Sequence, residues 1–347
     1  MRIALITDAW LPQVNGVVRT LTTVIAELRS RGHVVEVTSP DLYRSIPAPS
    51  YSEIRLALVG PRAVARRIEA FRPDTIHIAT EGPLGWAARR YCLHKKLPFT
   101  TAYHTQFPDY IARRTRLPAS WFWPFIRCFH GPAARTMVAT GTIRAQLREQ
   151  GVEPLHHWSR GVDVGTFHPD YPPPDLFFTL PRPIQLYVGR VSVEKNIEAF
   201  LGNAHPGSKV VVGAGPALEK LQARFPEAHF LGKRTGDELA ACYAGADVFV
   251  FPSKTDTFGL VMIEALACGT PVAAYPVPGP LDVLEPASGV MAERIEDAIA
   301  GALRLDRAAC HQLGKAFSWH ASADQFVSGL APIARETASA RLAKAPA

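Results

Sequence analysis

Short apolar runs alternate with longer amphipathic segments along most of the chain. Residues 2–10, 75–79 and 244–251 predict buried strands, because a parallel sheet covered on both faces is built from largely apolar runs. Residues 12–32 instead carry apolar side chains at helical spacing and predict an amphipathic helix that ends near Gly32. This repeated order of strand, turn and helix predicts doubly wound α/β domains, in which ligands gather at the carboxyl ends of the strands.

The stretch PSKTDTFGLVMIEALACGTPV at residues 252–272 follows one of these strands. It predicts a turn and then a helix that begins near Phe258. The first turn of such a helix presents unpaired N–H groups at its positive end, which suit a phosphate or the hydroxyls of a sugar. Asp256 lies just before the helix and Glu264 about two turns into it, so both acids can face one cleft. The alternative is an ordinary strand, loop and helix with two solvated acids.

Other residues at predicted strand ends are also candidates. Gly16 allows a ligand or another domain to approach the backbone closely, although the turn alone could require it. His104 directly follows a strand and is placed to donate a hydrogen bond into a cleft, or it is structural. Arg190 and Lys195 offer two cations to one diphosphate, with surface salt bridging as the alternative. Asp8, Thr80 and Glu81 lie at strand ends with weaker support.

The length of 347 residues predicts two domains. The proline-rich segment 156–184 lacks apolar periodicity and is the predicted boundary. We therefore expect one domain at 1–165, a second at 166–325, and a helix or tail at 326–347. The start has no signal-peptide pattern, so we predict a cytoplasmic protein. The five cysteines are scattered and indicate neither a metal site nor a disulfide framework.

The net charge of +7 is unevenly distributed. Residues 55–148 hold 16 Lys and Arg against 4 acids, a balance of +12, whereas residues 179–320 hold 13 against 15, a balance of −2. This asymmetry predicts that the amino-terminal half meets an anionic membrane surface or nucleic acid. The sequence has no helix-turn-helix, RNP, KH or zinc-finger pattern, so we expect no nucleic-acid partner.

Residues 110–130 combine four basic residues with a cluster of aromatic residues. If the aromatic side chains are exposed beside the arginines, the segment predicts an interfacial anchor on an anionic membrane. The residues of this anchor would be Arg113, Arg114, Trp121, Phe122 and Trp123, with Arg116, Phe125 and Phe129 beside them. The alternative is aromatic packing beneath a loop with solvated arginines.

Five motifs together resemble glycosyltransferase family 4, whose members have the GT-B fold and retain the anomeric configuration. They are GRVSVEKN at 189–196, GAGP at 213–216, FLGKR at 230–234, the stretch at 252–272, and PQVNGVVRT at 12–20. The segment SRGVDVGTFHP at 159–169 resembles the interdomain connector of family members, particularly those that glycosylate lipids. The resemblance covers residues 1 to about 325. It implies two Rossmann-like domains that face each other across a cleft, with residues 1–165 as the acceptor-binding domain and residues 166–325 as the nucleotide-sugar-binding domain.

The resemblance also implies roles for individual residues. Arg190 and Lys195 would hold the donor diphosphate, and Glu264 would bind the ribose hydroxyls. The donor sugar would meet His104 near the reacting carbon. The remaining implied contacts are Gly16 at the phosphates, Asp256 with the amides of Phe258, Gly259 and Leu260 at the sugar, and backbone from Leu231 to Lys233 at the base. The family usually has glutamate where this chain has Asp256, whose side chain is one methylene shorter.

The resemblance implies a retaining hexosyltransferase that uses a nucleotide sugar. We expect UDP-glucose or UDP-glucuronic acid as donor and a membrane lipid such as diacylglycerol as acceptor. The alternatives are GDP-mannose as donor, a soluble or polysaccharide acceptor, or a nucleotide-sugar-binding protein without activity. Two cations and a helix N-terminus would supply the positive charge at the diphosphate, so no metal and no other cofactor are expected. The enzyme would associate peripherally with the inner face of the cell membrane.

Overall fold

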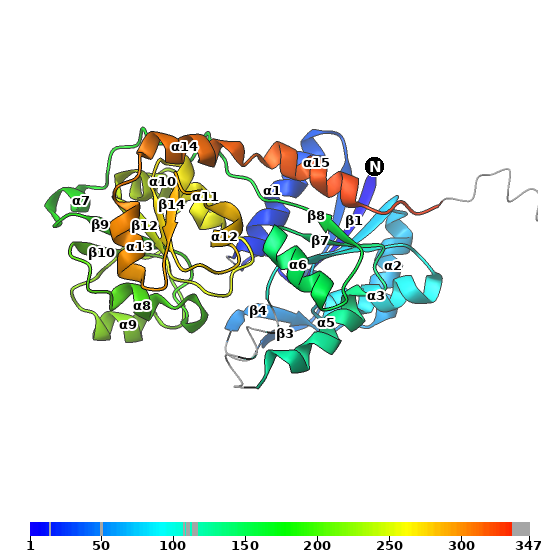
Figure 1. Cartoon of the computed structure of the whole chain (residues 1–347). Helices are drawn as coiled ribbons and strands as arrows, with labels where there is room; N and C mark the ends of the chain where they lie inside the picture. The colour runs from blue at the N-terminus through cyan, green and yellow to red at the C-terminus, as the bar shows by residue number, and fades with distance from the viewer. Residues whose placement is uncertain (14, 49–50, 107, 109–111, 113–116, 335–347) are drawn as a thin grey trace, which may run out of the picture.

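The computed structural model describes residues 1–13, 15–48, 51–106, 108, 112 and 117–334. Two lobes lie side by side, and each holds a six-stranded parallel sheet with helices packed against it (Figure 1). The predicted pair of doubly wound α/β domains is confirmed. The apolar runs predicted this fold correctly because strands covered by helices on both faces of a sheet need apolar side chains. The central strands of both sheets are indeed buried along their whole length.

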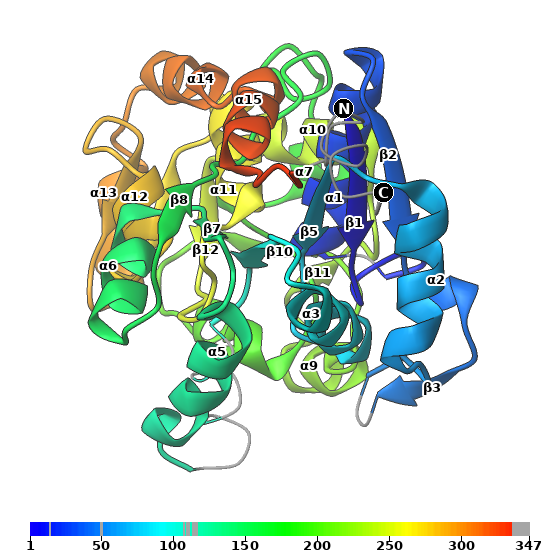
Figure 2. The same cartoon turned by 90° about the vertical axis from the view of Figure 1, so that its right-hand side faces the viewer.

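The first sheet has the strand order β2-β1-β5-β6-β7-β8. Its strands are β1 (Arg2–Ile6), β2 (Val34–Thr38), β5 (Thr75–Ile78), β6 (Thr100–Tyr103), β7 (Arg135–Val138) and β8 (Leu155–His157). Its helices are α1 (Gly16–Ser30), α2 (Pro61–Phe71), α3 (Pro83–Lys95), α5 (Trp123–His130) and α6 (Gly141–Glu149). Smaller elements are η1 (Pro40–Leu42), η2 (Ala119–Phe122) and the hairpin of β3 (Ser45–Ala48) and β4 (Tyr51–Ala57). Figure 2 shows α3 lying between α2 and α5.

The turn after β1 places α1 at the edge where the two lobes meet (Figure 1). The side chain of Asn15 accepts a hydrogen bond of 3.0 Å from the backbone N–H of Val18 and so caps the helix. One face of α1 buries Val18, Leu21, Val24, Ile25 and Leu28 against the first sheet. The opposite face is therefore free to meet the second lobe.

The second sheet has the strand order β11-β10-β9-β12-β13-β14. Its strands are β9 (Ile184–Val188), β10 (Ser208–Val212), β11 (His229–Phe230), β12 (Val248–Phe251), β13 (Val272–Ala274) and β14 (Gly289–Met291). The elements around it are α7 (Asp175–Thr179), η3 (Val193–Lys195), α8 (Ile197–Leu201), α9 (Leu218–Arg224), α10 (Gly236–Gly245), α11 (Leu260–Ala267), α12 (Pro280–Val283), α13 (Ile295–Ala302) and α14 (Arg307–Ala316). All neighbouring strand pairs in both sheets are parallel.

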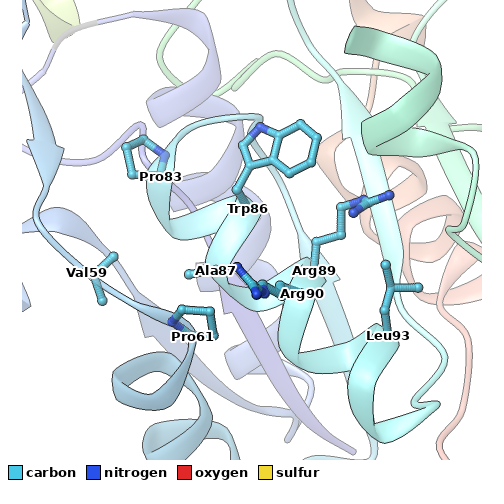
Figure 3. A pocket seen from close by; sticks show the side chains of 8 residues that line it. All are labelled: Val59, Pro61, Pro83, Trp86, Ala87, Arg89, Arg90 and Leu93. Carbon is cyan, nitrogen blue, oxygen red and sulfur yellow. The ribbon is translucent and has the colours of Figure 1, made fainter. Parts of the chain in front are cut away.

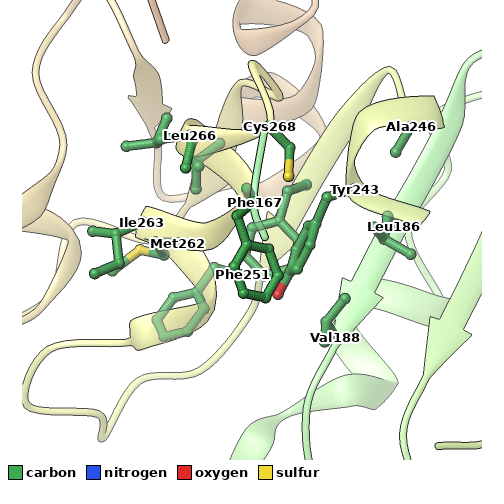
Figure 4. Close-up of a cluster of buried hydrophobic side chains, with 14 of the residues drawn as sticks. Phe167, Leu186, Val188, Tyr243, Ala246, Phe251, Met262, Ile263, Leu266 and Cys268 are labelled. Atoms are coloured by element: carbon green, nitrogen blue, oxygen red, sulfur yellow. The ribbon is translucent and has the colours of Figure 1, made fainter. Parts of the chain in front are cut away.

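Helix α11 packs into the core of the second lobe, where Met262, Ile263 and Leu266 meet side chains from β9, β12 and α10 (Figure 4). It begins at Leu260 rather than near Phe258. The reason lies at Gly259, whose φ of 84° is outside the helical range. A Cβ at Gly259 would lie 2.9 Å from the ring of Phe251, so a larger residue would not fit there without a shift.

Helix α15 (Trp319–Gly329) returns from the second lobe to the first (Figure 1). Its Phe326 is fully buried and contacts the fully buried Trp158 with 4.9 Å between ring centroids. The hydroxyl of Ser322 accepts a hydrogen bond of 3.2 Å from the indole of Trp158. The end of the chain thus stabilises the connector between the lobes. No helix in the described ranges is both long and apolar enough to cross a membrane.

Candidate active site

The carboxyl ends of the two sheets face each other and touch. The hydroxyl of Thr257, after β12, donates a hydrogen bond of 2.7 Å to the backbone carbonyl of His104, after β6. The backbone N–H of Thr142 at the start of α6 donates to the Asp282 carboxylate of α12 at 3.0 Å. These contacts bring strand-end loops of both domains to one interface. Ligands of doubly wound domains are expected at such an edge.

Glu264 on α11 is the most deeply buried of the predicted acids, with 2% of its surface exposed. Its carboxylate forms an ion pair with Arg19 of α1 in the other domain and accepts a hydrogen bond of 3.1 Å from the hydroxyl of Tyr243. Burial raises the pKa of Glu264, and the positive charge of Arg19 acts in the opposite direction. The guanidinium of Arg19 also lies over the ring of Phe167, 5.3 Å from its centroid.

Lys195 and Asp256 come together although they lie in different loops. The Lys195 Nζ is 2.5 Å from Asp256 Oδ1, and both side chains are about one quarter exposed. Asp256 Oδ2 is buried and has no hydrogen-bond partner among the described residues. Asn196 links the two loops, because its side chain donates a hydrogen bond of 3.0 Å to the Pro252 carbonyl. One carboxylate oxygen of Asp256 therefore neutralises Lys195, while the other is enclosed by the protein.

The other predicted donor residues lie in loops of both domains. Arg190 follows β9 and is half-buried, and its carbonyl accepts a 2.8 Å hydrogen bond from the hydroxyl of Tyr187. Gly16 is exposed at the start of α1, where an added Cβ would lie 3.7 Å from the side chain of Leu260. Gly16 thus lies directly opposite the first turn of α11, where Phe258 is buried and Gly259 and Leu260 are half-buried. The half-buried Leu231 and the exposed Lys233 lie in the loop after the edge strand β11.

His104 is held by a residue that the sequence analysis did not single out. The guanidinium of Arg160 in the connector lies 3.0 Å from His104 Nδ1. Because a guanidinium can only donate, Nδ1 accepts and the imidazole proton sits on Nε2. His104 Nε2 is buried and has no hydrogen-bond partner within the described ranges. Burial, followed by the charge of Arg160, holds the pKa of His104 well below its usual value, so the ring is neutral.

Arg160 is itself 5% exposed, and burial lowers its pKa to about 9. Its remaining hydrogen bonds go to the backbone carbonyls of Trp158 at 2.7 Å and Ser159 at 3.2 Å. A buried cation is costly unless it is hydrogen-bonded, and these carbonyls supply the acceptors. The motif SRGVDVGTFHP contained Arg160, but only the fold shows that its side chain reaches His104.

The carboxyl edge of the first sheet also carries two acids, Asp8 and Glu81. Asp8 is buried and accepts hydrogen bonds from the backbone N–H groups of Leu84 at 2.9 Å and Gly85 at 3.2 Å. Burial outweighs these bonds and raises the pKa of Asp8 to about 6. Glu81 Oε1 lies 3.2 Å from Nε2 of His130, and the His130 side chain is fully buried. These residues follow β1 and β5, and both lie on the first domain.

The aromatic residues of the predicted membrane anchor differ in their exposure to solvent. Trp121 is 66% exposed and Phe122 is half-buried. Trp123 is only 6% exposed because it begins α5 and packs against Ile126 and Tyr103, so it cannot belong to a surface anchor. Arg113 and Arg114 lie outside the described residues, as does Arg116. The proposed anchor therefore keeps Trp121 and Phe122 and loses Trp123.

Within the described ranges, no group of three or more His, Cys, Asp or Glu side chains is arranged to hold a metal ion. The chemistry available at the interface is instead that of cations, a neutral imidazole N–H and helix-terminal amides. This set can bind a phosphorylated ligand and orient a sugar.

Two Rossmann-like domains that meet at their carboxyl edges, with cations and a buried carboxylate between them, define a nucleotide-sugar-dependent glycosyltransferase of the GT-B class. Comparison with known sequences identifies the family: residues 14–166 match the model of Glycosyltransferase Family 4, and residues 182–305 match that of Glycosyl transferases group 1. The chain belongs to glycosyltransferase family 4.

Similar proteins agree with this assignment. The chain is 32% identical to a GDP-mannose-dependent alpha-mannosyltransferase of Mycobacterium tuberculosis, over 86% of this chain and 87% of that protein. It is 31% identical to an alpha-monoglucosyldiacylglycerol synthase of Streptococcus pneumoniae, over 79% and 71% of the two chains. A sucrose-phosphate synthase structure from Thermosynechococcus elongatus has the same fold, with a TM-score of 0.74 at 24% identity over 94% and 97% of the chains.

We predict that Lys195→Ala lowers turnover by at least tenfold while the fold is retained, because the ammonium would no longer stabilise charge on the departing diphosphate. Initial rates at saturating donor and the far-ultraviolet circular dichroism spectrum measure the two effects. Lys220→Ala is the matched control, since Lys220 is a surface lysine of α9 that pairs with Glu198. A Lys195→Ala enzyme with near-normal turnover would refute the phosphate role.

Arg160→Met is expected to raise the pKa of His104, because the variant removes a positive charge that opposes protonation of the ring. The nitrogen and carbon-bound proton resonances of the His104 imidazole, followed by NMR over pH, report both the pKa and the tautomer. Arg160→Lys keeps the charge and should hold the pKa low, and Arg148→Met removes an exposed arginine as a control. An unchanged His104 titration in Arg160→Met would contradict this interpretation.

Proposed function

We propose that this chain is a retaining hexosyltransferase that moves a sugar from a nucleotide diphosphate sugar to a hydroxyl group of a membrane lipid. One observation carries the donor half of the proposal. At the interface where the carboxyl edges of the two sheets meet, every acid of the donor set is paired with a cation: Glu264 with Arg19, and Asp256 with Lys195. A nucleotide sugar brings both hydroxyls and a diphosphate, which can replace these partners.

The geometry supports a separate role for each group of the donor site. The buried Glu264 carboxylate would accept hydrogen bonds from the ribose hydroxyls once Arg19 moves aside. Lys195, with Arg190, would turn to the diphosphate and stabilise the negative charge that grows as the sugar departs. The N–H groups at the start of α11, opposite Gly16, would add positive potential at the same phosphates.

The neutral His104 has one free donor, Nε2–H, and would give it to a hydroxyl of the sugar. Reaction on the front face lets a phosphate oxygen of the leaving group receive the acceptor proton, so no protein nucleophile takes part. Asp256 and Glu264 are consequently binding groups and do not form a hydrolase carboxylate pair. Contact between the domains would exclude water and limit hydrolysis of the donor.

GDP-mannose is our first candidate donor. The GDP-mannose-dependent relative matches this chain over 87% of its own length, against 71% for the glucosyldiacylglycerol synthase at nearly equal identity. UDP-glucose, and then UDP-glucuronic acid, follow as the donors expected from the resemblance alone. The shortened Asp256 is consistent with either series, because its free Oδ2 could reach the sugar directly or through a water.

The lipid acceptor rests on two supports. One is the similarity to a synthase that glycosylates a diacylglycerol lipid. The other is the surface of the first domain, where Trp121 and Leu117 are exposed in the same stretch of chain as the exposed Arg127. Such a surface suits peripheral attachment to an anionic membrane, which we place at the inner face of the cell membrane. A soluble or polysaccharide acceptor is the second candidate.

The test of this function is a matrix of donors and acceptors read by mass spectrometry. GDP-mannose, UDP-glucose and UDP-glucuronic acid are each offered with diacylglycerol, with a total membrane lipid extract, and with soluble sugars. We expect one donor to yield a product whose mass is that of a lipid plus the sugar residue of that donor, a hexose for GDP-mannose or UDP-glucose and a hexuronic acid for UDP-glucuronic acid, and Lys195→Ala to lose it. Products formed only on soluble sugars would replace the lipid acceptor with the second candidate.

Membrane attachment is tested separately by flotation with vesicles that contain phosphatidylglycerol. We expect binding at low salt to fall severalfold in Trp121→Asp and to weaken on adding salt, because both the aromatic insertion and the charge attraction contribute. Phe178→Asp is the control: Phe178 is 71% exposed but lies on α7 of the second domain. Equal flotation of both variants would refute the role of Trp121.

A further inference from the structure

An apolar groove runs along α3 on the outside of the first domain (Figure 3). Its lining comes from the start of α2 and from successive turns of α3: Val59, Pro61, Pro83, Trp86, Ala87, Arg89, Arg90 and Leu93. Apart from the two arginines, every lining side chain is apolar. From Pro83 to Leu93 the helix rises roughly 15 Å, at about 1.5 Å per residue. The groove is therefore long and narrow, with a shape suited to an extended hydrocarbon chain.

One end of the groove lies at the edge of the cleft. Pro83 is the first residue of α3, and the next two residues, Leu84 and Gly85, donate their backbone N–H groups to the carboxylate of Asp8. Gly82 packs so closely on Asp8 that an added Cβ would lie 2.3 Å from its carboxyl carbon. Asp8 follows β1 at the carboxyl edge of the sheet, which faces the donor domain. A molecule seated in the groove can thus extend its other end into the cleft.

The wall of the groove is rigid. The ring of Trp86 packs against Phe125 and Phe129 of α5, with centroid separations of 5.3 and 5.1 Å. Arg89 lies over the ring of Trp86 and donates a hydrogen bond of 3.0 Å from Nε to the carbonyl of Phe129. A second hydrogen bond joins Arg89 to the carbonyl of Cys128. These contacts fix α3 to α5, so the groove is formed before any ligand binds.

The rim of the groove is cationic. Arg90 lines it (Figure 3), and Arg62 and Arg66 are exposed on the neighbouring helix α2. These three arginines form no ion pair within the described part of the chain. Leu93 is 41% exposed at the far end. An apolar floor bordered by cations complements a lipid whose chain is apolar and whose neighbours in the bilayer are anionic.

We propose that this groove binds one acyl chain of a glycerolipid acceptor, while the arginines on its rim contact the anionic head groups of the surrounding membrane. The inference rests on the proposed lipid acceptor and adds where that lipid lies. The acyl chain follows α3 from Leu93 toward Pro83, and the acceptor hydroxyl reaches the cleft beside Asp8. Chain length then contributes to acceptor affinity, because each methylene buried in the groove adds favourable transfer free energy.

Leu93→Asp tests the groove against a control of equal exposure. Leu42→Asp places the same charge at a leucine of the same domain that is 42% exposed and does not line the groove, whereas Leu93 is 41% exposed. We expect Leu93→Asp to raise KM for a long-chain diacylglycerol about tenfold. Its KM for a short-chain diacylglycerol and its rate of donor hydrolysis should stay at the level of the wild type. Equal KM values for the long-chain acceptor in both variants would refute the proposal that the groove binds an acyl chain.

A photoreactive lipid gives a readout that does not depend on turnover. Diacylglycerol with a diazirine in one acyl chain is irradiated with the full-length protein in phosphatidylglycerol vesicles, and the labelled peptides are identified by mass spectrometry. We expect labelling within residues 83–93, reduced in Leu93→Asp but not in Leu42→Asp. Labelling outside residues 83–93 while the lipid is glycosylated would refute the groove as the acyl-chain site but leave the lipid acceptor standing. Labelling of residues 83–93 without any glycosylated lipid would instead overturn the lipid as acceptor.

Discussion

The burial of the Glu264 carboxylate constrains how the two domains meet. A charged group removed from water needs partners that replace its hydration, and here they are the hydroxyl of Tyr243 and the guanidinium of Arg19. Tyr243 belongs to the same domain as Glu264, but Arg19 lies on α1 of the other. Full compensation therefore exists only while the domains touch. When they separate, or when a ligand displaces Arg19, another hydrogen-bond donor must take its place, and the hydroxyls of a ribose have the required chemistry.

The fold could be predicted because its strands are short, apolar and buried on both faces, as in β9 and β12. Element ends were harder to predict. Helix α11 begins two residues later than expected, because Gly259 adopts a φ of 84°, which is outside the helical range. The ring of Phe251 also leaves no room for a side chain at this position. Neighbouring aromatic residues also differ in exposure: Trp121 lies in η2 and points to solvent, whereas Trp123 begins α5 and enters the core.

Prediction of the site had a similar limit. Residues at strand ends, such as His104 and Lys195, could be found because parallel strands bring their carboxyl ends to one edge. Their partners could not be found in the same way. Arg19 reaches Glu264 from the other domain, and Arg160 reaches His104 from the connector. Neither pairing leaves a periodic or local signal in the sequence, because it arises from the way the two domains and their connector pack.

Both acids of the proposed donor site are paired with cations, since Lys195 neutralises Asp256 and Arg19 neutralises Glu264. At an effective dielectric constant near 20, a pair of charges about 4 Å apart attracts by roughly 4 kcal/mol. A neutral sugar could not displace such pairs, whereas a diphosphate brings charge of its own. In the proposed function, the donor diphosphate would replace Asp256 as the partner of Lys195, and Asp256 would then accept hydrogen bonds from sugar hydroxyls. The pairing of Lys195 with a carboxylate thus supports the proposal of a donor that carries a diphosphate.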